Sequence, residues 1–293
     1  MSGLLFRACA LRTSLEAQLI VAPRTPRTKL LLNTSVIGSV EPDFLRALEG
    51  NAFLHSKQVH IVSSQEFHAN WQMQGHAQSV LTHLASVLRD MGLSGAWRNE
   101  RAHVYDAQGE LVGAIERGVV RVLGINTQSV GLMGWTADQR IWVQQRAATK
   151  SDNPMLWDIL SNGMVTDADD VRSALARETW EEAGLDVKVL SHVQYAGQFA
   201  YARPSKAGNG AGYLRETMNW FSAIVEEHFH PKNQDGEVAQ FACLTPDEIL
   251  NAIEMQSFTL DAAYVLVSEI VKMLEKKGIE PDALCDFIPH SYQ

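Results

Sequence analysis

Apolar residues recur at helical spacing in two segments of the first third of the chain. Residues 41–50 read EPDFLRALEG, and residues 77–93 read AQSVLTHLASVLRDMGL. A helix that packs on a sheet needs its apolar residues on one face. In the second segment that face consists of Val80, Leu81, Leu84, Val87 and Leu88. The pattern predicts two helices within a small α+β region.

Short apolar runs separated by turn residues follow this region and are typical of strands. Asp106–Gly109 is a turn signal inside a predicted hairpin, and VGLMGWT (130–136) is joined to RIWVQQRA (140–147) by ADQ. Longer strand-like segments cover residues 188–202 and 215–225. The stretch between 149 and 163, TKSDNPMLWDILSNG, is interpreted as a loop that leads into a central helix.

Two helices are predicted at the end of the chain. The first begins at a capping box, with Thr245 as N-cap, Pro246 at the first helical position and Glu248 at the third. The second covers about residues 259–277 and ends at Gly278. Strands before and after one central helix, with helices last, favour a mixed α/β sandwich over a parallel doubly wound sheet. We divide the chain into domains at 1–115 and 116–285.

Composition excludes several classes of function. The 293 residues carry a formal net charge of −9, which argues against general nucleic-acid binding. No apolar run approaches the roughly 20 residues that a membrane span needs. The three cysteines are too few for a disulfide scaffold or a thiolate zinc site. We therefore expect a soluble, cytoplasmic protein without a membrane partner, although the arginine-rich first 28 residues have the bias of either an organellar presequence or a plain amphipathic helix.

The segment RETWEEAGL, residues 177–185, crowds acids on one helical turn. Glu178, Glu181 and Glu182 are neighbours at helical spacing, and each like-charged pair destabilises a helix by about 0.2–0.5 kcal/mol. A hard divalent cation such as Mg²⁺ or Mn²⁺ would turn this repulsion into coordination. Solvated surface glutamates are the alternative interpretation.

The wider segment GMVTDADDVRSALARETWEEAGL, residues 163–185, resembles the Nudix box, G-x5-E-x7-R-E-U-x-E-E-x-G-U with U an aliphatic residue. Two positions depart from it, because Asp169 replaces a glutamate and Thr179 replaces an aliphatic residue. The resemblance implies a Nudix α/β/α sandwich with a mixed sheet, which the small α+β N-terminal domain would precede, and a Nudix domain over residues 116–285.

The same resemblance implies a site that hydrolyses a diphosphate with Mg²⁺ or Mn²⁺. The implied metal ligands are Glu178, Glu181, Glu182 and the carbonyl of Gly163, and Arg177 would fork onto a neighbouring acid. The base that activates water is expected outside the box, at Glu216 or Glu237. For Glu216, a cross-strand ion pair with Lys or Arg is an equal alternative.

Flanking segments are similar to a narrower branch of this family. WRNER, IERGVVRVLGI, VGLMGW before IWVQQRAATK, and HPKNQDGEVAQFACLTPDEIL resemble Nudix proteins related to the N-terminal part of fungal thiamine pyrophosphokinase, over about residues 30–280. This implies cleavage of thiamine diphosphate or its oxo and oxy analogues to the monophosphate plus phosphate. Asn162 in LSNG departs from the two adjacent glycines of that branch. Asparagine tolerates unusual backbone angles, which would preserve the loop.

Three further residues are expected to contact the substrate. Lys150 and Arg146 would bind phosphate, with ordinary surface charges as the alternative, and Trp157 would offer a flat wall, with core packing as its alternative. Other functions stay open, namely hydrolysis of a nucleoside diphosphate derivative such as ADP-ribose or NADH, and a catalytically silent Nudix-fold binding module. The sequence also leaves the oligomeric state open, a homodimer included.

Overall fold

The computed structural model of the protein describes residues 2–44, 60–62 and 71–276. Its centre is a seven-stranded sheet in which five strands follow one another in the order β11-β12-β7-β8-β13, and two short strands pair with β7 and β8 beside this path. The strands along the path are β11 (Ser191–Ser205), β12 (Gly212–Ile224), β7 (Asn126–Trp135), β8 (Ile141–Arg146) and β13 (Val238–Leu244). β12 runs parallel to β7, whereas β11 and β13 pair antiparallel with their neighbours. The expected mixed sheet is therefore confirmed.

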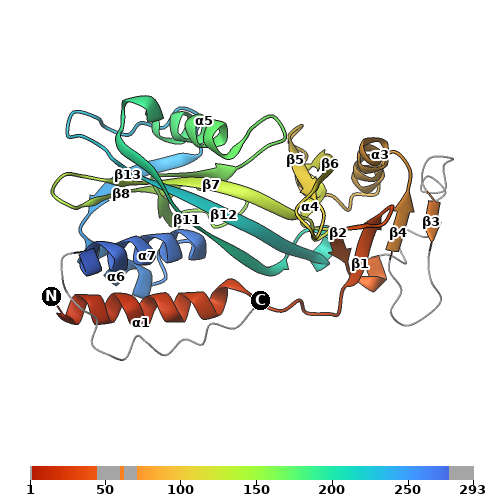
Figure 1. Ribbon diagram of the computed structural model, residues 1–293, viewed down its shortest axis with the longest axis horizontal. Coiled ribbons are helices and arrows are strands. Elements are labelled where there is room, and N and C mark those ends of the chain that lie inside the picture. The colour runs from red at the N-terminus through yellow and green to blue at the C-terminus, as the bar shows by residue number, and fades with distance from the viewer. Residues whose placement is uncertain (1, 45–59, 63–70, 277–293) are drawn as a thin grey trace.

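Helices cover both faces of this sheet (Figure 1). α5 (Val171–Ala183) packs on one face, over a core that includes Val130, Leu132 and Phe221. α6 (Pro246–Glu254) and α7 (Leu260–Lys276) pack on the other, over Met133 and Val143. The predicted capping box of α6 is present. The result is the α/β/α sandwich that the sequence predicts, and none of the helices within the described residues is both long and apolar enough to cross a membrane.

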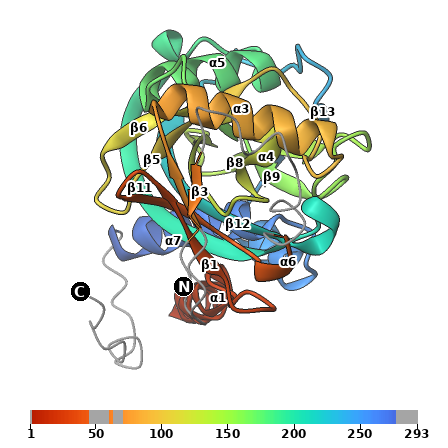
Figure 2. The same ribbon diagram turned by 90° about the vertical axis from the view of Figure 1, so that its right-hand side faces the viewer.

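The N-terminal region forms an α+β unit at one end of the sandwich, on the right in Figure 1 and toward the viewer in Figure 2. Its four strands have the order β2-β1-β4-β3, and a hairpin and two helices accompany them. The elements are β1 (Thr28–Leu32), β2 (Ser35–Val40), β3 (His60–Val62), β4 (Trp71–Gln74), α3 (Ala77–Asp90), β5 (Arg101–Tyr105), β6 (Leu111–Glu116) and the short α4 (Arg117–Val120). All five apolar residues expected on one face of α3 are buried, which confirms that helix. Most of the helix predicted at 41–50 lies outside the described residues.

The first helix, α1 (Ser2–Leu19), packs against α7 rather than against the N-terminal sheet (Figure 1). Leu5, Leu15 and Leu19 are buried in the same apolar core as the α7 side chains. Arg7 adds polar contacts, because its Nε and Nη2 donate to the Glu254 carboxylate at 2.8 and 2.7 Å. The division at 115/116 stays a prediction, but α1 packs as part of the C-terminal unit.

The segment predicted as a loop before α5 contains two short strands. β9 (Trp157–Ile159) pairs with β8, and β10 (Ser161–Met164) pairs with β7. The prediction was wrong because polar residues such as Asp158 and Asn162 alternate with apolar ones in runs of only three or four residues. Single 3₁₀ turns, Val187–Val189 and Gly208–Gly210, precede β11 and β12.

Candidate active site

Local interactions fix both ends of the helix that carries the acids. The Asp170 side chain accepts hydrogen bonds from the backbone nitrogens of Arg172 and Ser173 at 2.9 and 2.8 Å. Ser173 Oγ accepts from the Asp170 nitrogen in return. At the other end Gly184 adopts a left-handed conformation with φ 65°, which ends α5. The sequence analysis missed the N-cap Asp170.

Gly163 lies directly against the first acid of α5. It is part of strand β10, opposite Val130, and not part of a turn as expected. A Cβ atom at this position would overlap the Glu178 carboxyl group. The glycine is therefore required by close approach, since any larger residue would displace the carboxylate.

Arg177 connects three acids around the start of the site. Its Nε and Nη2 donate to Asp169 Oδ2 at 3.0 and 2.8 Å, and its Nη1 donates to Glu178 Oε1 at 2.8 Å. Nη1 also donates to Glu181 Oε2 at 3.1 Å. Nη2 donates further to the carbonyl of Met164. The shorter Asp169 thus still accepts from the arginine, and the guanidinium orients the Glu178 carboxylate.

Glu182 is the most deeply buried acid of the helix, with 2% of its surface exposed. Its Oε2 accepts from Gln144 Nε2 at 2.6 Å and from the Asn162 nitrogen at 2.8 Å. Burial raises the pKa of Glu182 to about 8, and the charge of Glu178 adds to this effect. Burial also raises the pKa of Glu178 to about 7, against the opposing charge of Arg177. The surroundings of both acids therefore supply too little positive charge to stabilise their ionised forms.

Glu181 has a different environment from the other two acids. Its side chain is 41% exposed and makes an ion pair with Arg177. Within the described residues, no three His, Cys, Asp or Glu side chains converge closely enough to hold a metal ion on their own. Glu178 and Glu182 are thus the two acids with the burial and the uncompensated charge that a cation site needs.

These residues fit a hard divalent cation. Carboxylate oxygens are the ligands that Mg²⁺ prefers, and Mg²⁺ usually keeps several waters and takes only one or two protein carboxylates. The buried Glu182 and the mostly buried Glu178, both with raised pKa values, supply that number, and the absence of a side chain at Gly163 leaves room for the Glu178 carboxylate. Glu178 and Glu182 would hold the ion, while waters and substrate oxygens complete its shell.

The two candidate bases lie in different environments. Glu237 pairs with Lys150, so two expected site residues contact each other. Burial raises the pKa of Glu237, but the hydrogen bond and charge of Lys150 outweigh burial and leave the pKa below its ordinary value. The charge of Glu237 also raises the pKa of Glu178, which places both acids in one electrostatic cluster.

Glu216 lies on β12 and accepts a hydrogen bond from Tyr201 Oη at 2.6 Å. The alternative of an ion pair is not what the structure shows, because the strand partner across from Glu216 is this tyrosine and not Lys or Arg. Thr127 Oγ1 contacts the other carboxylate oxygen at 3.4 Å. Among the described contacts, none connects Glu216 to a side chain of α5.

Arg146 belongs to a buried polar cluster beside Glu182. Its Nη1 pairs with Asp158 Oδ2 at 3.0 Å, and Asp158 is fully buried. Burial and the charge of Asp261 raise the pKa of Asp158 to about 7. Asn162 Nδ2 donates to Asp158 at 3.3 Å and to Asp261 at 3.0 Å. Arg146 is therefore a buried ion-pair partner, not the exposed basic residue of the alternative interpretation.

The sequence analysis missed Asp158 and Asp261, although an acid between the apolar Trp157 and Ile159 is a signal of a buried polar role. It also gave the wrong reason for tolerating Asn162, whose backbone is that of an ordinary strand. Trp157 is half-buried against the α7-side core, and its backbone bonds to Ser257 and Thr259. This environment favours the packing interpretation of Trp157.

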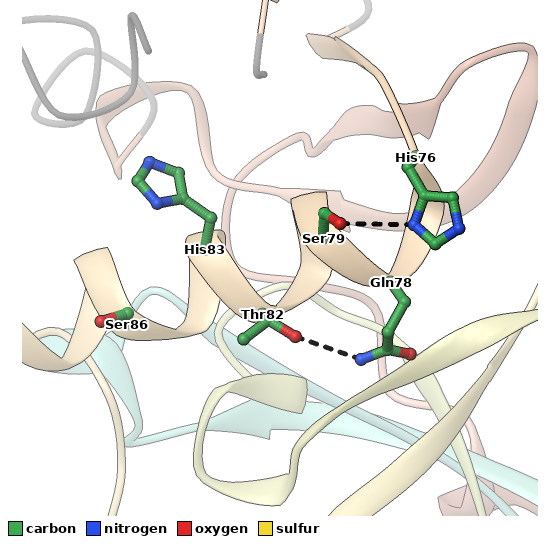
Figure 3. A pocket seen from close by; sticks show the side chains of 6 residues that line it. All are labelled: His76, Gln78, Ser79, Thr82, His83 and Ser86. Atoms are coloured by element: carbon green, nitrogen blue, oxygen red, sulfur yellow. Dashed lines mark hydrogen bonds between the residues drawn. The ribbon is translucent and has the colours of Figure 1, made fainter. Parts of the chain in front are cut away.

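One hollow lies elsewhere on the molecule. It has a volume of about 490 Å³ on the outer face of α3, far along the chain from α5, and opens widely to solvent (Figure 3). Its lining is polar and consists of His76, Gln78, Ser79, Thr82, His83 and Ser86. It contains no acid and no residue of the 163–185 segment, so the chemistry argued above does not involve it.

Comparisons with known proteins agree with this geometry. Residues 126–263 match the family model of the NUDIX domain. The chain is 26% identical over 215 residues to the uncharacterized protein YJR142W of Saccharomyces cerevisiae, covering 67% of this chain and 62% of that protein. It is 25% identical over 176 residues to Nudix hydrolase 20, chloroplastic, of Arabidopsis thaliana, covering 59% and 46%.

The match thus spans less than two thirds of either relative's length. Among solved structures, the crystal structure of DR0079 from Deinococcus radiodurans is 20% identical with a TM-score of 0.47, covering 58% of this chain and 98% of that chain. The matched range contains β7, the box segment, α5 and the start of α7. Residues 126–263 are therefore similar to the NUDIX domain, and this similarity covers a little under half of the chain.

Proposed function

We propose that the protein is a divalent-cation-dependent hydrolase of diphosphates. The observation that carries this function is a pair of acids on α5: Glu178 is mostly buried and lies against Gly163, and Glu182 is buried and receives hydrogen bonds from β8 and β10. A cation stabilises the ionised form of two such carboxylates, which have too little positive charge around them.

Each residue of the site has a separate task in this reaction. When bound, the divalent cation neutralises charge on the phosphate oxygens and lowers the pKa of a water molecule. Glu178 and Glu182 hold it, and Arg177 fixes the Glu178 carboxylate through its bridge to Asp169. Glu181 would take part through Arg177, which it contacts.

We assign the base to Glu237 rather than Glu216. The charge of Glu237 acts on Glu178, and its lowered pKa keeps Glu237 ionised near neutral pH, which is the form that a base requires. Lys150 lies beside it and is the cation best placed to receive a phosphate. Glu216 instead accepts a hydrogen bond from Tyr201, so it has no comparable link to Glu178 or Glu182 among the described contacts.

For the substrate we propose thiamine diphosphate or its oxo and oxy analogues, cleaved to the monophosphate plus phosphate. The sequence resemblance of the segments around the box supports this choice. The side chains of Arg146, Asp158, Asn162 and Asp261 form a polar cluster next to Glu182, and we assign to this cluster the few polar contacts that orient a ring system.

The test is phosphate release from thiamine diphosphate, oxothiamine diphosphate, ADP-ribose and NADH, with Mg²⁺ or Mn²⁺. Wild type is compared with Glu182→Gln, which keeps the shape but removes the charge, and with the exposed control Glu275→Gln on α7. We expect metal-dependent turnover of a thiamine compound, a loss of about 100-fold or more in Glu182→Gln, and no loss in the control.

Other outcomes separate the parts of the proposal. Turnover of ADP-ribose or NADH without turnover of a thiamine compound would support the cation site on α5 and reject the thiamine assignment. Turnover that Glu182→Gln leaves intact would reject the assignment of the metal acids. A wild type that binds Mn²⁺ but hydrolyses none of the four compounds would favour the binding-module alternative.

A further inference from the structure

Gln144 on β8 contacts the metal acid Glu182 and has no role in the reaction described above. Its side chain is 1% exposed, and its Nε2 donates to Glu182 Oε2 at 2.6 Å. A carboxylate accepts hydrogen bonds but does not donate them, so the contact needs the amide nitrogen on this side. Gln144 therefore presents a donor that suits Glu182 in the ionised form, which is the form that binds a cation.

Both hydrogen bonds that the described residues make to the Glu182 carboxylate end on the same oxygen. Oε2 accepts from Gln144 and from the Asn162 nitrogen, which come from two different strands of one sheet. Two donors from a rigid sheet fix the plane of the carboxylate. Oε1 is then the oxygen left for a cation.

The type of side chain at position 144 suits this task. An amide donates a hydrogen bond without adding positive charge, so the carboxylate keeps the charge that binds a cation. A Lys or Arg at this point would neutralise it. Supporting hydrogen bonds of this kind orient metal ligands and tune the affinity of many metal sites.

The other end of the amide is unusual. Gln144 Oε1 is buried and has no hydrogen-bond partner among the described residues. Buried polar atoms are normally paired, and an unpaired one lowers stability. A residue selected only for packing would be apolar here, because an apolar side chain of the same shape would avoid this loss.

We propose that Gln144 is a positioning residue: it holds Glu182 Oε2 so that Oε1 faces the cation. This inference rests on the proposed function, because it assigns the cation to the same site. Its own prediction concerns metal binding, which can be measured without substrate.

The experiment measures Mn²⁺ binding to the purified full chain by electron paramagnetic resonance. Gln144→Met keeps the shape and removes the donor. Its matched control is Gln145→Met, since Gln145 is the next residue on β8 and bonds Met155 and Gln240 instead. We expect Gln144→Met to weaken Mn²⁺ binding by about 10-fold or more and Gln145→Met to leave it within about twofold.

A second comparison asks whether Gln144 acts through Glu182. In a Glu182→Gln background, we expect Gln144→Met to cause no further loss of Mn²⁺ binding, because the two residues form one unit. Thermal unfolding of each variant shows whether it is folded. If Gln144→Met does not fold, Gln144→Asn replaces it, whose donor is one methylene too short to reach Glu182.

The proposal would be overturned if a folded Gln144 variant bound Mn²⁺ as tightly as the wild type. It would also be overturned if Gln144→Met weakened Mn²⁺ binding as much in the Glu182→Gln background as in the wild type. Diphosphate turnover is measured in parallel, and its result tests the proposed reaction independently of the role of Gln144. Wild type that binds Mn²⁺ without turnover contradicts the proposed reaction, while the Gln144 result still decides the positioning role. Wild type that binds no Mn²⁺ contradicts both.

Discussion

At the scale of single residues, the site depends on the absence of a Cβ atom at Gly163. The Glu178 carboxylate occupies the space of a Cβ atom, so the strand β10 and the helix α5 meet at this point without a side chain between them. Arg177 then holds the same carboxylate from its other side. One methyl group added at Gly163 is therefore enough to move the Glu178 carboxylate.

Gly163→Ala should lower kcat with the preferred diphosphate by about 100-fold or more, because a shift of about 1 Å in a reacting group has an effect of that size. The measurement is steady-state turnover with thermal unfolding alongside. Gly3→Ala, where an added Cβ meets no atom within 4 Å, serves as the control and should leave kcat unchanged. Equal activity of the two variants would contradict the close-approach argument.

How much of the site the sequence predicts depends on the distance between residues along the chain. Gly163, Arg177 and Glu178 stand at fixed offsets within one segment, so their pattern is visible before any fold is known. Gln144 meets Glu182, and Asp158 and Asp261 meet at Asn162, only after the sheet and α7 have formed. Among these three, Asp158 alone has a local signal of burial, since it stands between two apolar residues, and the types of Gln144 and Asp261 indicate nothing of the kind.

At the scale of elements, the end of α5 also positions the segment before β13. Lys232 donates its backbone nitrogen to the Ala183 carbonyl, and Gln234 donates to that of Glu181. Glu237 follows a few residues later. Backbone hydrogen bonds next to Gly184 therefore connect the end of α5 to the segment that leads to Glu237, the proposed base.

Gly184→Ala should destabilise the protein by about 2–4 kcal/mol, since a left-handed alanine costs about 1–2 kcal/mol and its Cβ would also meet the Lys232 carbonyl. Gly236 has a positive φ as well, but no atom lies within 4 Å of an added Cβ. Gly236→Ala should therefore cost only about 1 kcal/mol. Urea unfolding measures both values, and equal losses would show that the contact with Lys232 has no weight.

Long elements with a strong pattern, such as α3, α6 and the strands β7 and β8, follow from the sequence. β9 and β10 do not, because a strand of three or four residues has too few positions to show alternation. They form because β7 and β8 already offer free edges at those points. Tertiary pairing, not local preference, decides their conformation.

At the scale of the whole molecule, the face of the sheet that α7 covers is completed by α1. Leu5 is 1% exposed within this core, whereas its neighbour Phe6 is 54% exposed. The large difference in burial between adjacent residues provides a direct test of α1 packing.

Leu5→Ala should lower the free energy of unfolding by about 2–4 kcal/mol, because it leaves a cavity between α1 and α7. Phe6→Ala should change it by less than about 0.5 kcal/mol. Chemical denaturation measures both. A larger loss for Phe6→Ala would mean that α1 packs with a different face.

Stability of the cation-free protein should fall between about pH 5 and pH 8. The pKa values of Asp158, Glu178 and Glu182 are raised to about 7, 7 and 8 in the folded state, so the folded protein binds more protons than the unfolded one in this range. The carboxylic acids then lose protons as the pH rises, and the folded state loses stability. Melting temperatures across this range measure the effect.

Adding Mg²⁺ should restore stability mainly at the alkaline end, because the cation binds carboxylates and not the protonated acids. The control is Glu182→Gln, which should lose most of the Mg²⁺ effect. A Mg²⁺ effect that is as large at pH 5 as at pH 8 would contradict the assignment of buried acids to the cation.

The packing of α1 on α7 also sets an order of events during synthesis. The ribosome makes α1 before its partner α7, which begins about 240 residues later, at Leu260. At a synthesis rate of about 5–20 residues per second, the apolar side chains of α1 wait on the order of ten seconds or more before that partner exists. A nascent chain of this protein therefore exposes the apolar side chains of α1 until α7 has been made, and chaperones that bind such side chains are expected to protect them until the sandwich closes.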